Sequence, residues 1–329
     1  MDPLSQGLLG ASAPSAYLKE KKNLGYVLLI GCLSGMAPDL DILIRSSNDP
    51  LFFLEYHRQF THSLIFIPFG GLICAAILHF FLKKKLGFRK TFLYSCLGYG
   101  THGLLDGCTS YGTQLLWPFS TTRFAWNNVS IVDPLFTLPL LILIIISFFK
   151  KNLKFSKAAF IYAIFYLLVG VIQRERVEKI AYQIANKRGH TPIRMSVKPS
   201  LGNLVLWKIV YEENNNYYVD AVKLIVRPEI FYGESIEKLD IEKDFPYLKS
   251  ESIQKNDIAR FSWFSNQYIA KNPYHENSVI DVRYSFIPNE IDPLWGIELN
   301  PKNLNKHAQF KSYRRLNPII KDKFFEMLF

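Results

Sequence analysis

Five apolar runs in the first half of the chain constrain its fold more than any other feature. They cover residues 24–44, 63–82, 91–105, 134–149 and 158–172. Several approach the ~20 residues that a helix needs to cross a bilayer, and two are shorter. A weaker apolar segment, 4–18, precedes them, and Asp2-Pro3 in front of it is typical of a helix start. We therefore predict a membrane α-helical bundle of five to six transmembrane or re-entrant helices.

Basic residues gather in short clusters between these runs, at 19–22, 83–90 and 150–157. Positive residues prefer the cytoplasmic side of a membrane, and placing all three clusters inside makes the chain alternate consistently. The N-terminus and everything after residue 173 are then external. The basic excess behind the formal net charge of +11 is thus explained by membrane topology, and no nucleic-acid-binding motif accompanies it. The acidic start also argues against a secretory signal peptide.

The second half of the chain has a different texture. Stretches rich in β-branched and aromatic residues, such as NLVLWKIVYEE and YYVDAVKLIV, flank an NNN tract that predicts a hairpin turn. A second alternating run covers 278–287, and 249–271 is expected to contain a helix. We predict a membrane domain over residues 1–178 and an extramembrane, mainly β (α+β) domain over 179–329.

The predicted topology places the histidines and aspartates of the first half at the outer ends of the helices. His102 and Asp106 are four residues apart, so both face one side of a helix. The other members lie in APDLD, in HRQFTHS and at the N-terminus: Asp39, Asp41, His57, His62 and Asp2. Because lysines and hydropathy alone fixed the topology, their arrival at one membrane face is independent support for a shared site.

Imidazole and carboxylate side chains at such spacings are ligands for a divalent metal. We predict one or two ions, zinc with manganese or iron as alternatives, held by His57, His62, His102, Asp106, Asp41 and Asp2, with Asp39 in a catalytic role. Such a metal makes a water nucleophile available near neutral pH. Ionisable residues at membrane depth are functional candidates by default.

The loop after His102 and Asp106 carries the residues expected to contact a substrate. Aromatic side chains suit a membrane interface, and an arginine binds a phosphate or carboxylate with two hydrogen bonds. We predict a catalytic role for Arg123 and substrate contacts for Arg58, Tyr111, Trp117, Arg123 and Trp126. No nucleophile elbow, P-loop or dinucleotide fingerprint is present, which argues against a serine hydrolase, an NTPase and a dinucleotide-binding enzyme.

Five ordered motifs in residues 1–175 resemble the YdjM-like family: MDPLSQGLLGA, APDLD, HRQFTHS, HGLLDGCTSYGTQLLWPFS and DP. Its members are bacterial inner-membrane proteins expected to be metal-dependent hydrolases, some of them LexA-regulated. The resemblance implies metal ligation by His57, His62, His102 and Asp106, with Asp39 and Asp41 close by. Many relatives carry a Thr-His pair where this chain has Ser5-Gln6, which leaves Asp2 as the better N-terminal candidate.

The function expected from these features is metal-dependent hydrolysis of an ester or phosphoester in a membrane lipid or lipid-linked substrate, at a bacterial inner membrane. One alternative is a metal-binding transporter or sensor, although transport sites lie near the bilayer midplane and these residues map to one end. The other is a non-catalytic membrane scaffold with a structural metal. No nucleic-acid partner is expected, and the sequence names no protein partner.

Overall fold

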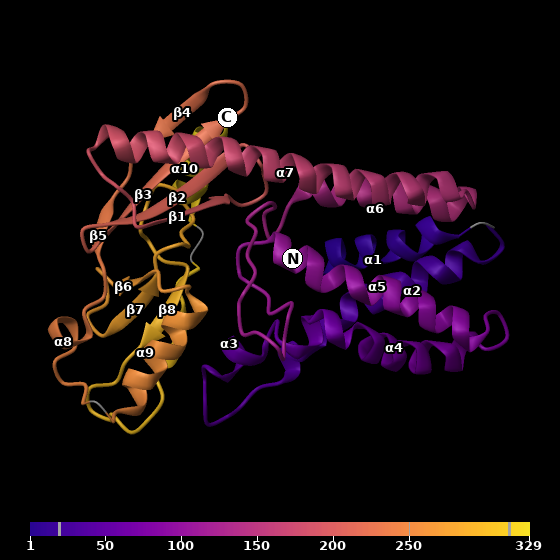
Figure 1. Ribbon diagram of the computed structural model, residues 1–329, viewed down its shortest axis with the longest axis horizontal. Helices are drawn as coiled ribbons and strands as arrows, with labels where there is room; N and C mark the ends of the chain where they lie inside the picture. Colours follow the sequence, from indigo (N-terminus) through magenta and orange to yellow (C-terminus); the bar gives the residue numbers. More distant parts are fainter. Residues whose placement is uncertain (19–20, 250, 315–316) are drawn as a thin grey trace. The chain divides into compact units, whose positions relative to one another are not determined.

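The structure divides the chain into two compact units. The computed structural model describes residues 1–18, 21–249, 251–314 and 317–329, so position 19 of the first basic cluster lies outside the described residues (Figure 1). The first unit contains Met1–Ile44, Tyr56–Ile172 and Leu201–Asn203. The second contains Arg45–Glu55, Gln173–Ser200 and Leu204–Phe329. The predicted boundary between 178 and 179 stays a prediction.

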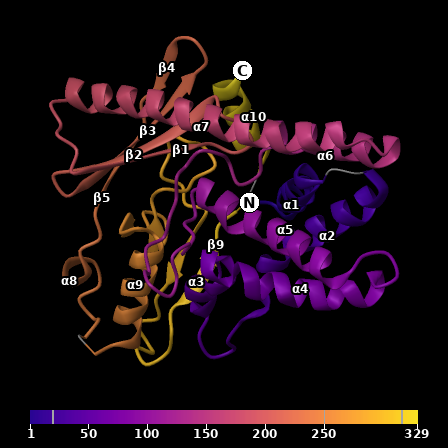
Figure 2. The same cartoon turned by 45° about the vertical axis from the view of Figure 1, so that its right-hand side comes forward.

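The first unit is helical, and every apolar run of the sequence forms helix there. Its α-helices are α1 (Pro3–Tyr17), α2 (Leu24–Met36), α4 (Ile67–Leu82), α5 (Phe88–Cys108), α6 (Pro134–Lys150) and the first part of α7 (Leu153–Lys187). Short 3-10 helices complete it: η1 (Lys21–Asn23), η2 (Ala37–Leu43), η3 (Phe60–His62) and η4 (Leu64–Phe66). In both views α1, α2, α4 and α5 run side by side (Figures 1 and 2). Asp2 caps α1 and Asp133 caps α6, each followed by proline, as the sequence predicts for Asp2-Pro3.

Three helical segments among the described residues are long and apolar enough to cross a membrane: Lys21–Leu43, Leu64–Leu82 and Leu153–Lys187. A shorter apolar helix covers Pro134–Lys150. The predicted number of five to six spans is not confirmed. The difference arises in α1 and α5, where glycine, serine and the site residues dilute the apolar sequence, and in α6, which has only 17 residues.

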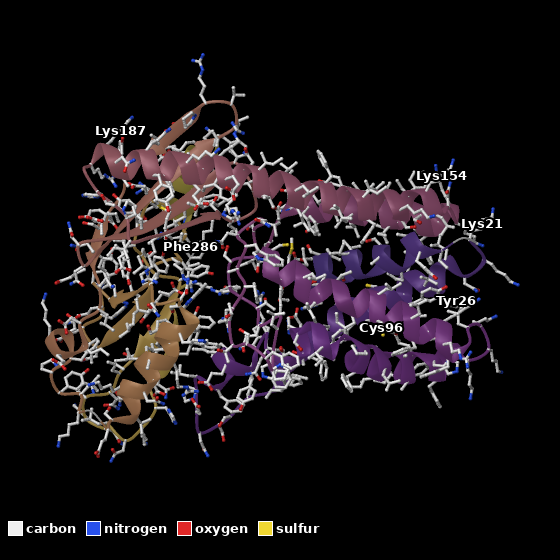
Figure 3. All side chains as sticks on the ribbon, viewed as in Figure 1. Lys21, Tyr26, Cys96, Lys154, Lys187 and Phe286 are labelled. Atoms are coloured by element: carbon white, nitrogen blue, oxygen red, sulfur yellow. The ribbon has the colours of Figure 1, made fainter. Side chains whose placement is uncertain are left out.

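The basic clusters lie together at one end of the helical unit. Lys21 and Lys154 mark this end in Figure 3, and the turn between α4 and α5, which carries Lys83 to Lys85, lies there too. The opposite end holds the start of α1 and the end of α5. The helices thus separate a basic end from the end that carries His102 and Asp106.

Close helix contacts through glycine hold this unit together. A Cβ on Gly31 of α2 would lie 2.3 Å from the carbonyl oxygen of Gly10 in α1. A Cβ on Gly98 of α5 would lie 2.6 Å from the carbonyl oxygen of Gly31 itself. Small residues let helix backbones approach in this way where lipid gives no hydrophobic drive for association. The packing fixes α2 against both α1 and α5, and so fixes the backbone that surrounds the site.

The second unit is built mainly from antiparallel strands. A five-stranded sheet has the order β1-β2-β3-β4, with β5 also paired to β3, and a four-stranded sheet has the order β6-β7-β8-β9. The strands are β1 (Arg194–Pro199), β2 (Leu206–Glu213), β3 (Asn216–Leu224), β4 (Pro228–Phe231), β5 (Ser235–Glu237), β6 (Ile269–Lys271), β7 (Ser278–Asp281), β8 (Trp295–Glu298) and β9 (Gln309–Ser312). Helices α3 (Phe52–Tyr56), α8 (Ile241–Asp244), α9 (Ile253–Phe264) and α10 (Pro318–Leu328) accompany them. The predicted β-rich domain is therefore confirmed.

The predicted hairpin and its turn are also present. Asn214 and Asn215 join β2 to β3 with φ of 45° and 64°, the left-handed conformation that asparagine tolerates in two-residue hairpin turns. Within the same unit, Arg260 of α9 binds Asp49 at 2.7 Å and Glu55 at 2.6 Å. The loop segment Arg45–Glu55 is thereby tied to the tail.

We expect Gly31→Ala to destabilise the helical unit by about 1–3 kcal/mol, because the new methyl group cannot fit against Gly10 without separating α1 from α2. Thermal unfolding of the detergent-solubilised full chain measures the effect. Gly87→Ala is the matched control, since a Cβ there meets no atom within 4 Å. Equal unfolding temperatures for the two variants contradict the packing argument.

Candidate metal centre

Three helical segments, α5, η2 and η3, bring polar side chains to one buried point of the helical unit. His102 and Asp106 project from the same face of α5, and both are fully buried. His62 ends η3 and is 2% exposed. Asp39 comes from η2, and its carboxylate is 26% exposed. Gly103 permits this meeting, because a Cβ there would lie 2.1 Å from the carbonyl oxygen of His62.

The atoms that meet at this point lack hydrogen-bond partners within the described part of the chain. They are Nε2 of His62, Nε2 of His102 and Oδ2 of Asp106, all buried. Buried polar groups in proteins are almost always satisfied, and an exception calls for an explanation such as an ion. These atoms come from two elements, α5 and η3, and lie close to one another beside the guanidinium of Arg58, which is an arrangement that metal ligands adopt.

The distances between these atoms fit a single ion. His62 Nε2 lies 3.5 Å from Asp39 Oδ1 and 3.4 Å from Asp106 Oδ2. His102 Nε2 lies 3.3 Å from Asp39 Oδ1 and 3.8 Å from Asp106 Oδ2. Ligand bonds of ~2.0–2.1 Å in a tetrahedral site place neighbouring ligands about 3.3–3.4 Å apart. The four ligand atoms of Asp39, His62, His102 and Asp106 therefore need only small shifts to bind one metal.

Outer contacts orient both histidines as ligands. His102 Nδ1 lies 2.6 Å from the carbonyl oxygen of Gly35, an acceptor, so Nδ1 carries the proton and Nε2 is free to coordinate. His62 Nδ1 lies 3.2 Å from Asp41 Oδ2 and 3.0 Å from the hydroxyl of Thr61. Such carboxylate and carbonyl contacts fix the tautomer and ring orientation of metal-binding histidines.

The charges of the cluster favour a cation. Burial alone lowers the pKa of His62, yet its carboxylate neighbours outweigh that effect and raise the pKa to about 10. The site thus attracts positive charge, which a proton on His62 or a bound metal ion supplies.

A second group of ligand atoms adjoins the first. Asp39, Asp41 and His57 bring one ligand atom each within 4.8 Å of one another, and Asp39 belongs to both groups. His57 Nδ1 lies 2.7 Å from Asp41 Oδ1, and the His57 side chain is 31% exposed. Carboxylates shared between two ions are common in two-metal sites. The arrangement could therefore hold two ions, one buried and one facing outward.

Arg58 lies beside the buried group in a strained backbone conformation. Its φ is 64°, which is uncommon for a residue with a side chain and often marks a functional site. The backbone N–H donates to Asp41 Oδ2 at 3.1 Å, and Nε of the buried guanidinium lies 3.0 Å from Asp106 Oδ2. Nη1 donates to Thr109, and the guanidinium lies 5.2 Å from the ring centre of Tyr111. A fixed positive charge thus stands next to the ligand cluster.

The structure brings most of the predicted site residues together. His57, His62, His102, Asp106 and Asp41 gather with Asp39, which we had predicted as catalytic. Asp2 instead caps α1, where its oxygens accept from the backbone N–H and hydroxyl of Ser5, and it belongs to neither group. Its role as a ligand stays a prediction.

The predicted substrate residues are dispersed along the loop after α5. Arg123 donates to the carbonyl oxygens of Tyr111 and Gly112. The ring of Trp117 is 6.0 Å from that of Phe60, and Trp126 packs where a Cβ on Gly107 would touch it. These roles stay predictions, and Arg58 and Tyr111 are the members whose contacts with the ligand cluster or its neighbours are seen.

Sequence reasoning missed the neighbours that orient the ligands. Gln6 Nε2 donates to Asp106 Oδ1 at 2.8 Å, and the amino group of Met1 contacts the same oxygen. Thr61 donates to Asp41 Oδ2 at 2.7 Å. The Gly35 carbonyl is a backbone group with no signature in the sequence. Two signals were available: Thr61 adjoins His62, and Gln6 occupies a position where many relatives carry a histidine.

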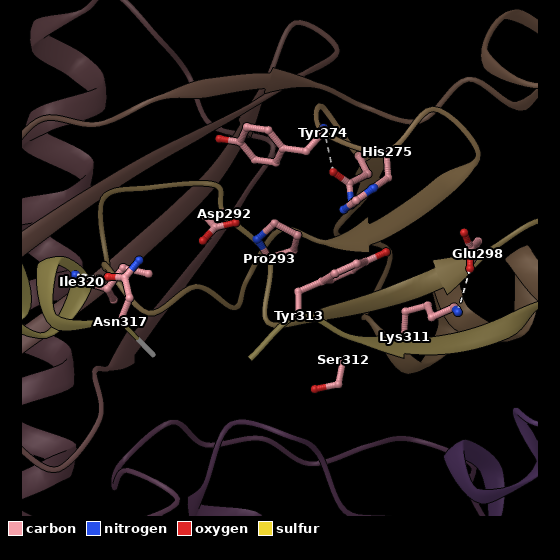
Figure 4. A pocket seen from close by; sticks show the side chains of 11 residues that line it. Tyr274, His275, Asp292, Pro293, Glu298, Lys311, Ser312, Tyr313, Asn317 and Ile320 are labelled. Atoms are coloured by element: carbon pink, nitrogen blue, oxygen red, sulfur yellow. Dashed lines mark hydrogen bonds and ion pairs between the residues drawn. The ribbon is translucent and has the colours of Figure 1, made fainter. Parts of the chain in front are cut away.

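A pocket lies in the β-rich unit. It has a volume of about 490 Å³ and is lined by polar and aromatic side chains, among them Tyr274, Asp292 and Tyr313 (Figure 4). The ring of His275 stacks on that of Tyr313 at 5.3 Å, and Lys311 pairs with Glu298. Unpartnered ligand atoms like those of the metal cluster are not found among its described lining residues.

Fold and site together define a helical membrane protein with a buried His/Asp cluster suited to a metal. Comparison with known proteins agrees with this class. The profile of the family described as YdjM inner membrane protein matches residues 1–177, and the chain belongs to that family.

Two relatives show how far the likeness extends. The chain is 25% identical to the uncharacterized protein YfhP of Bacillus subtilis (strain 168), over 79% of this chain and 78% of that protein. It is 30% identical to the inner membrane protein YbcI of Escherichia coli (strain K12), over 32% of this chain and 62% of that protein. No solved structure matches.

We expect the purified protein to bind about two equivalents of a divalent metal per chain, one at each ligand group. His102→Ala should lose the ion of the buried group, and His57→Ala should retain it while losing the outer one. Elemental analysis of protein washed free of excess metal gives the stoichiometry.

His79→Ala is the control for these variants. This histidine lies on α4 with its ring 5.4 Å from that of Phe88, and it belongs to neither ligand group. Metal content in His102→Ala equal to that in His79→Ala contradicts the assignment of His102.

Proposed function

We propose that this protein is a metal-dependent hydrolase of an ester or phosphoester, with a membrane lipid or lipid-linked molecule as substrate. The observation that carries the proposal is the set of unpartnered ligand atoms on His62, His102 and Asp106 beside the guanidinium of Arg58. A purely structural ion needs the ligands alone. A hydrolytic site also needs a group that receives the charge developing on the substrate, and Arg58 meets that need.

Zinc is the metal that this donor set suits best, with manganese or iron as alternatives. Two imidazoles and one carboxylate, from His62, His102 and Asp106, match the ligand types of catalytic zinc sites, which use three protein ligands and keep a fourth position for water. When bound, such a metal acts as a Lewis acid and makes water nucleophilic near neutral pH.

The chain's own residues divide the remaining work. Asp39 is the carboxylate that reaches both ligand groups and is still 26% exposed, so it can accept a proton from an attacking water. Arg58 keeps its guanidinium next to Asp106, where it can hold an anionic oxygen of the substrate. We propose that Arg123, together with Trp117 and Trp126, contacts the part of the substrate that lies at the membrane surface.

The site is proposed to face the external side of the membrane. The basic clusters at the opposite end of the helical unit support a cytoplasmic location for that end. The contacts of Arg260 with Asp49 and Glu55 require the tail and the loop 45–55 to share one side. The further apolar helices α1 and α5 are proposed to cross or enter the membrane with the three long spans.

Turnover by the zinc-loaded full chain tests the enzyme. We expect hydrolysis of aryl phosphoesters or esters, and we expect Asp39→Asn to lower kcat/KM by about 10²-fold or more because it removes the proton acceptor. Arg58→Lys keeps the charge but loses the planar fork, so it should raise KM for anionic substrates. His79→Ala should match the unmodified protein.

The structural alternative gives a different result. Absence of turnover over a broad ester and phosphoester panel, with metal bound and its removal lowering only the unfolding temperature, rejects the enzyme.

Cysteine labelling tests the orientation. In a background free of the native cysteines, Asn48→Cys and Glu251→Cys should react with a membrane-impermeant maleimide in intact cells. Lys84→Cys, in the basic turn between α4 and α5, should react only after permeabilisation. Reaction of Asn48→Cys and Glu251→Cys from different sides refutes the topology.

A further inference from the structure

An apolar groove runs along the helical unit between α2–η2 and α4. Its volume is about 480 Å³, within the range of small-molecule sites. Its lining combines large apolar side chains with the small residues Ala37, Gly70 and Cys74. Ile73 and Ile77 on its wall are more than half exposed, so the groove is open along one side. The groove is therefore accessible from outside the helical unit along the side of Ile73 and Ile77.

One end of the groove is polar and belongs to the candidate metal centre. Asp41 and Thr61 line the groove, and Thr61 donates to Asp41 Oδ2 at 2.7 Å. Asp41 is also a member of the outer ligand group with Asp39 and His57. The groove is therefore continuous with the outer ligand group, the one whose His57 side chain is exposed to the surroundings.

The length of the groove matches one leaflet of a membrane. Along η4 and α4 the lining positions extend from Phe66 to Leu78, a stretch of about 18 Å at the helical rise of ~1.5 Å per residue. Half the hydrocarbon core of a bilayer is about 15 Å. These positions fall inside the candidate span Leu64–Leu82. A hydrocarbon chain that entered from the outer leaflet would find an apolar path of suitable length.

We propose that the groove binds the hydrocarbon chain of a phosphorylated amphiphile, with its phosphate at the outer ligand group of Asp39, Asp41 and His57. This inference rests on the proposed function and adds the substrate class. The outer ligand group at the polar end would hold a cation, and a cation there would bind phosphate oxygens, so the head group it suits is anionic. The rest of the groove is apolar and would make no favourable contact with a small water-soluble substrate.

Photo-crosslinking tests the groove without any need for turnover. The probe is hexadecyl phosphate with a diazirine in its chain, added to the zinc-loaded full chain in nanodiscs. Peptide mapping should place the adducts on the groove face, at Leu33, Ile73 or Ile77, and not on Leu72 of α4, which is 47% exposed but does not line the groove. Adducts spread over both faces of α4 indicate surrounding lipid only and overturn the proposal.

A pair of tryptophan variants isolates the groove. Cys74→Trp fills the floor and should reduce groove labelling about tenfold or more, a loss typical of a pocket that no longer admits an apolar group. Leu72→Trp adds the same side chain outside the groove and should leave labelling unchanged. Equal labelling of the two variants overturns the proposal.

Competition in the unmodified protein gives a test that does not depend on a variant folding. Protection against labelling should increase from butyl to octyl to dodecyl phosphate, and dodecanol should protect at least about tenfold less well than dodecyl phosphate. Equal protection by dodecanol overturns the placement of the phosphate.

Hydrolysis of a short, soluble phosphoester by the same samples separates the two proposals. Specific labelling without hydrolysis supports the groove and rejects the enzyme. Hydrolysis without groove labelling supports the enzyme and rejects the groove.

Discussion

The structure of the helical unit depends on how a buried cluster of ionisable groups is neutralised. Asp106, His62 and His102 are at most 2% exposed, and three of their polar atoms have no hydrogen bond within the described residues. Isolated charges in such a place cost several kcal/mol each, whereas paired or metal-bound ones are tolerated. A cation bound there would therefore also stabilise the elements that carry the ligands. It would join α5 to η2 and η3, which are both short.

The glycine contacts explain why this cluster can form at the end of a bundle. Gly10, Gly31 and Gly98 bring α1, α2 and α5 into backbone contact, and Gly35, one turn after Gly31, presents its carbonyl oxygen to His102. A helix pair separated by larger side chains would hold that oxygen too far away to fix the tautomer. Gly103 of α5 also lacks a Cβ, and this lets the backbone of His62 approach α5 closely. Helix packing and ligand orientation are thus one property of the sequence.

The sequence reveals more of the site than of the membrane topology. His102 and Asp106 were predictable because a helix places positions four apart on one face, and the lysine clusters located the ends of the helices. The 3-10 turn over Ala37–Leu43 was not predictable, although it is what turns both Asp39 and Asp41 toward the histidines. The number of spans is not confirmed, because α1 and α5 are apolar in part only and α6 is short. The loop 45–55 is tied to the tail by the contacts of Arg260. No sequence periodicity predicts a contact between residues about two hundred positions apart.

The two ligand groups differ in exposure, and this difference bears on what each can do. The buried group has histidines oriented by the Gly35 carbonyl and by Asp41, and only its Asp39 side chain is partly exposed. The outer group contains the partly exposed side chains of His57 and Asp39 and adjoins the groove through Asp41. An ion bound there would be less tightly enclosed than one in the buried group. Asp39 belongs to both groups, so an ion bound at either one would constrain a ligand of the other.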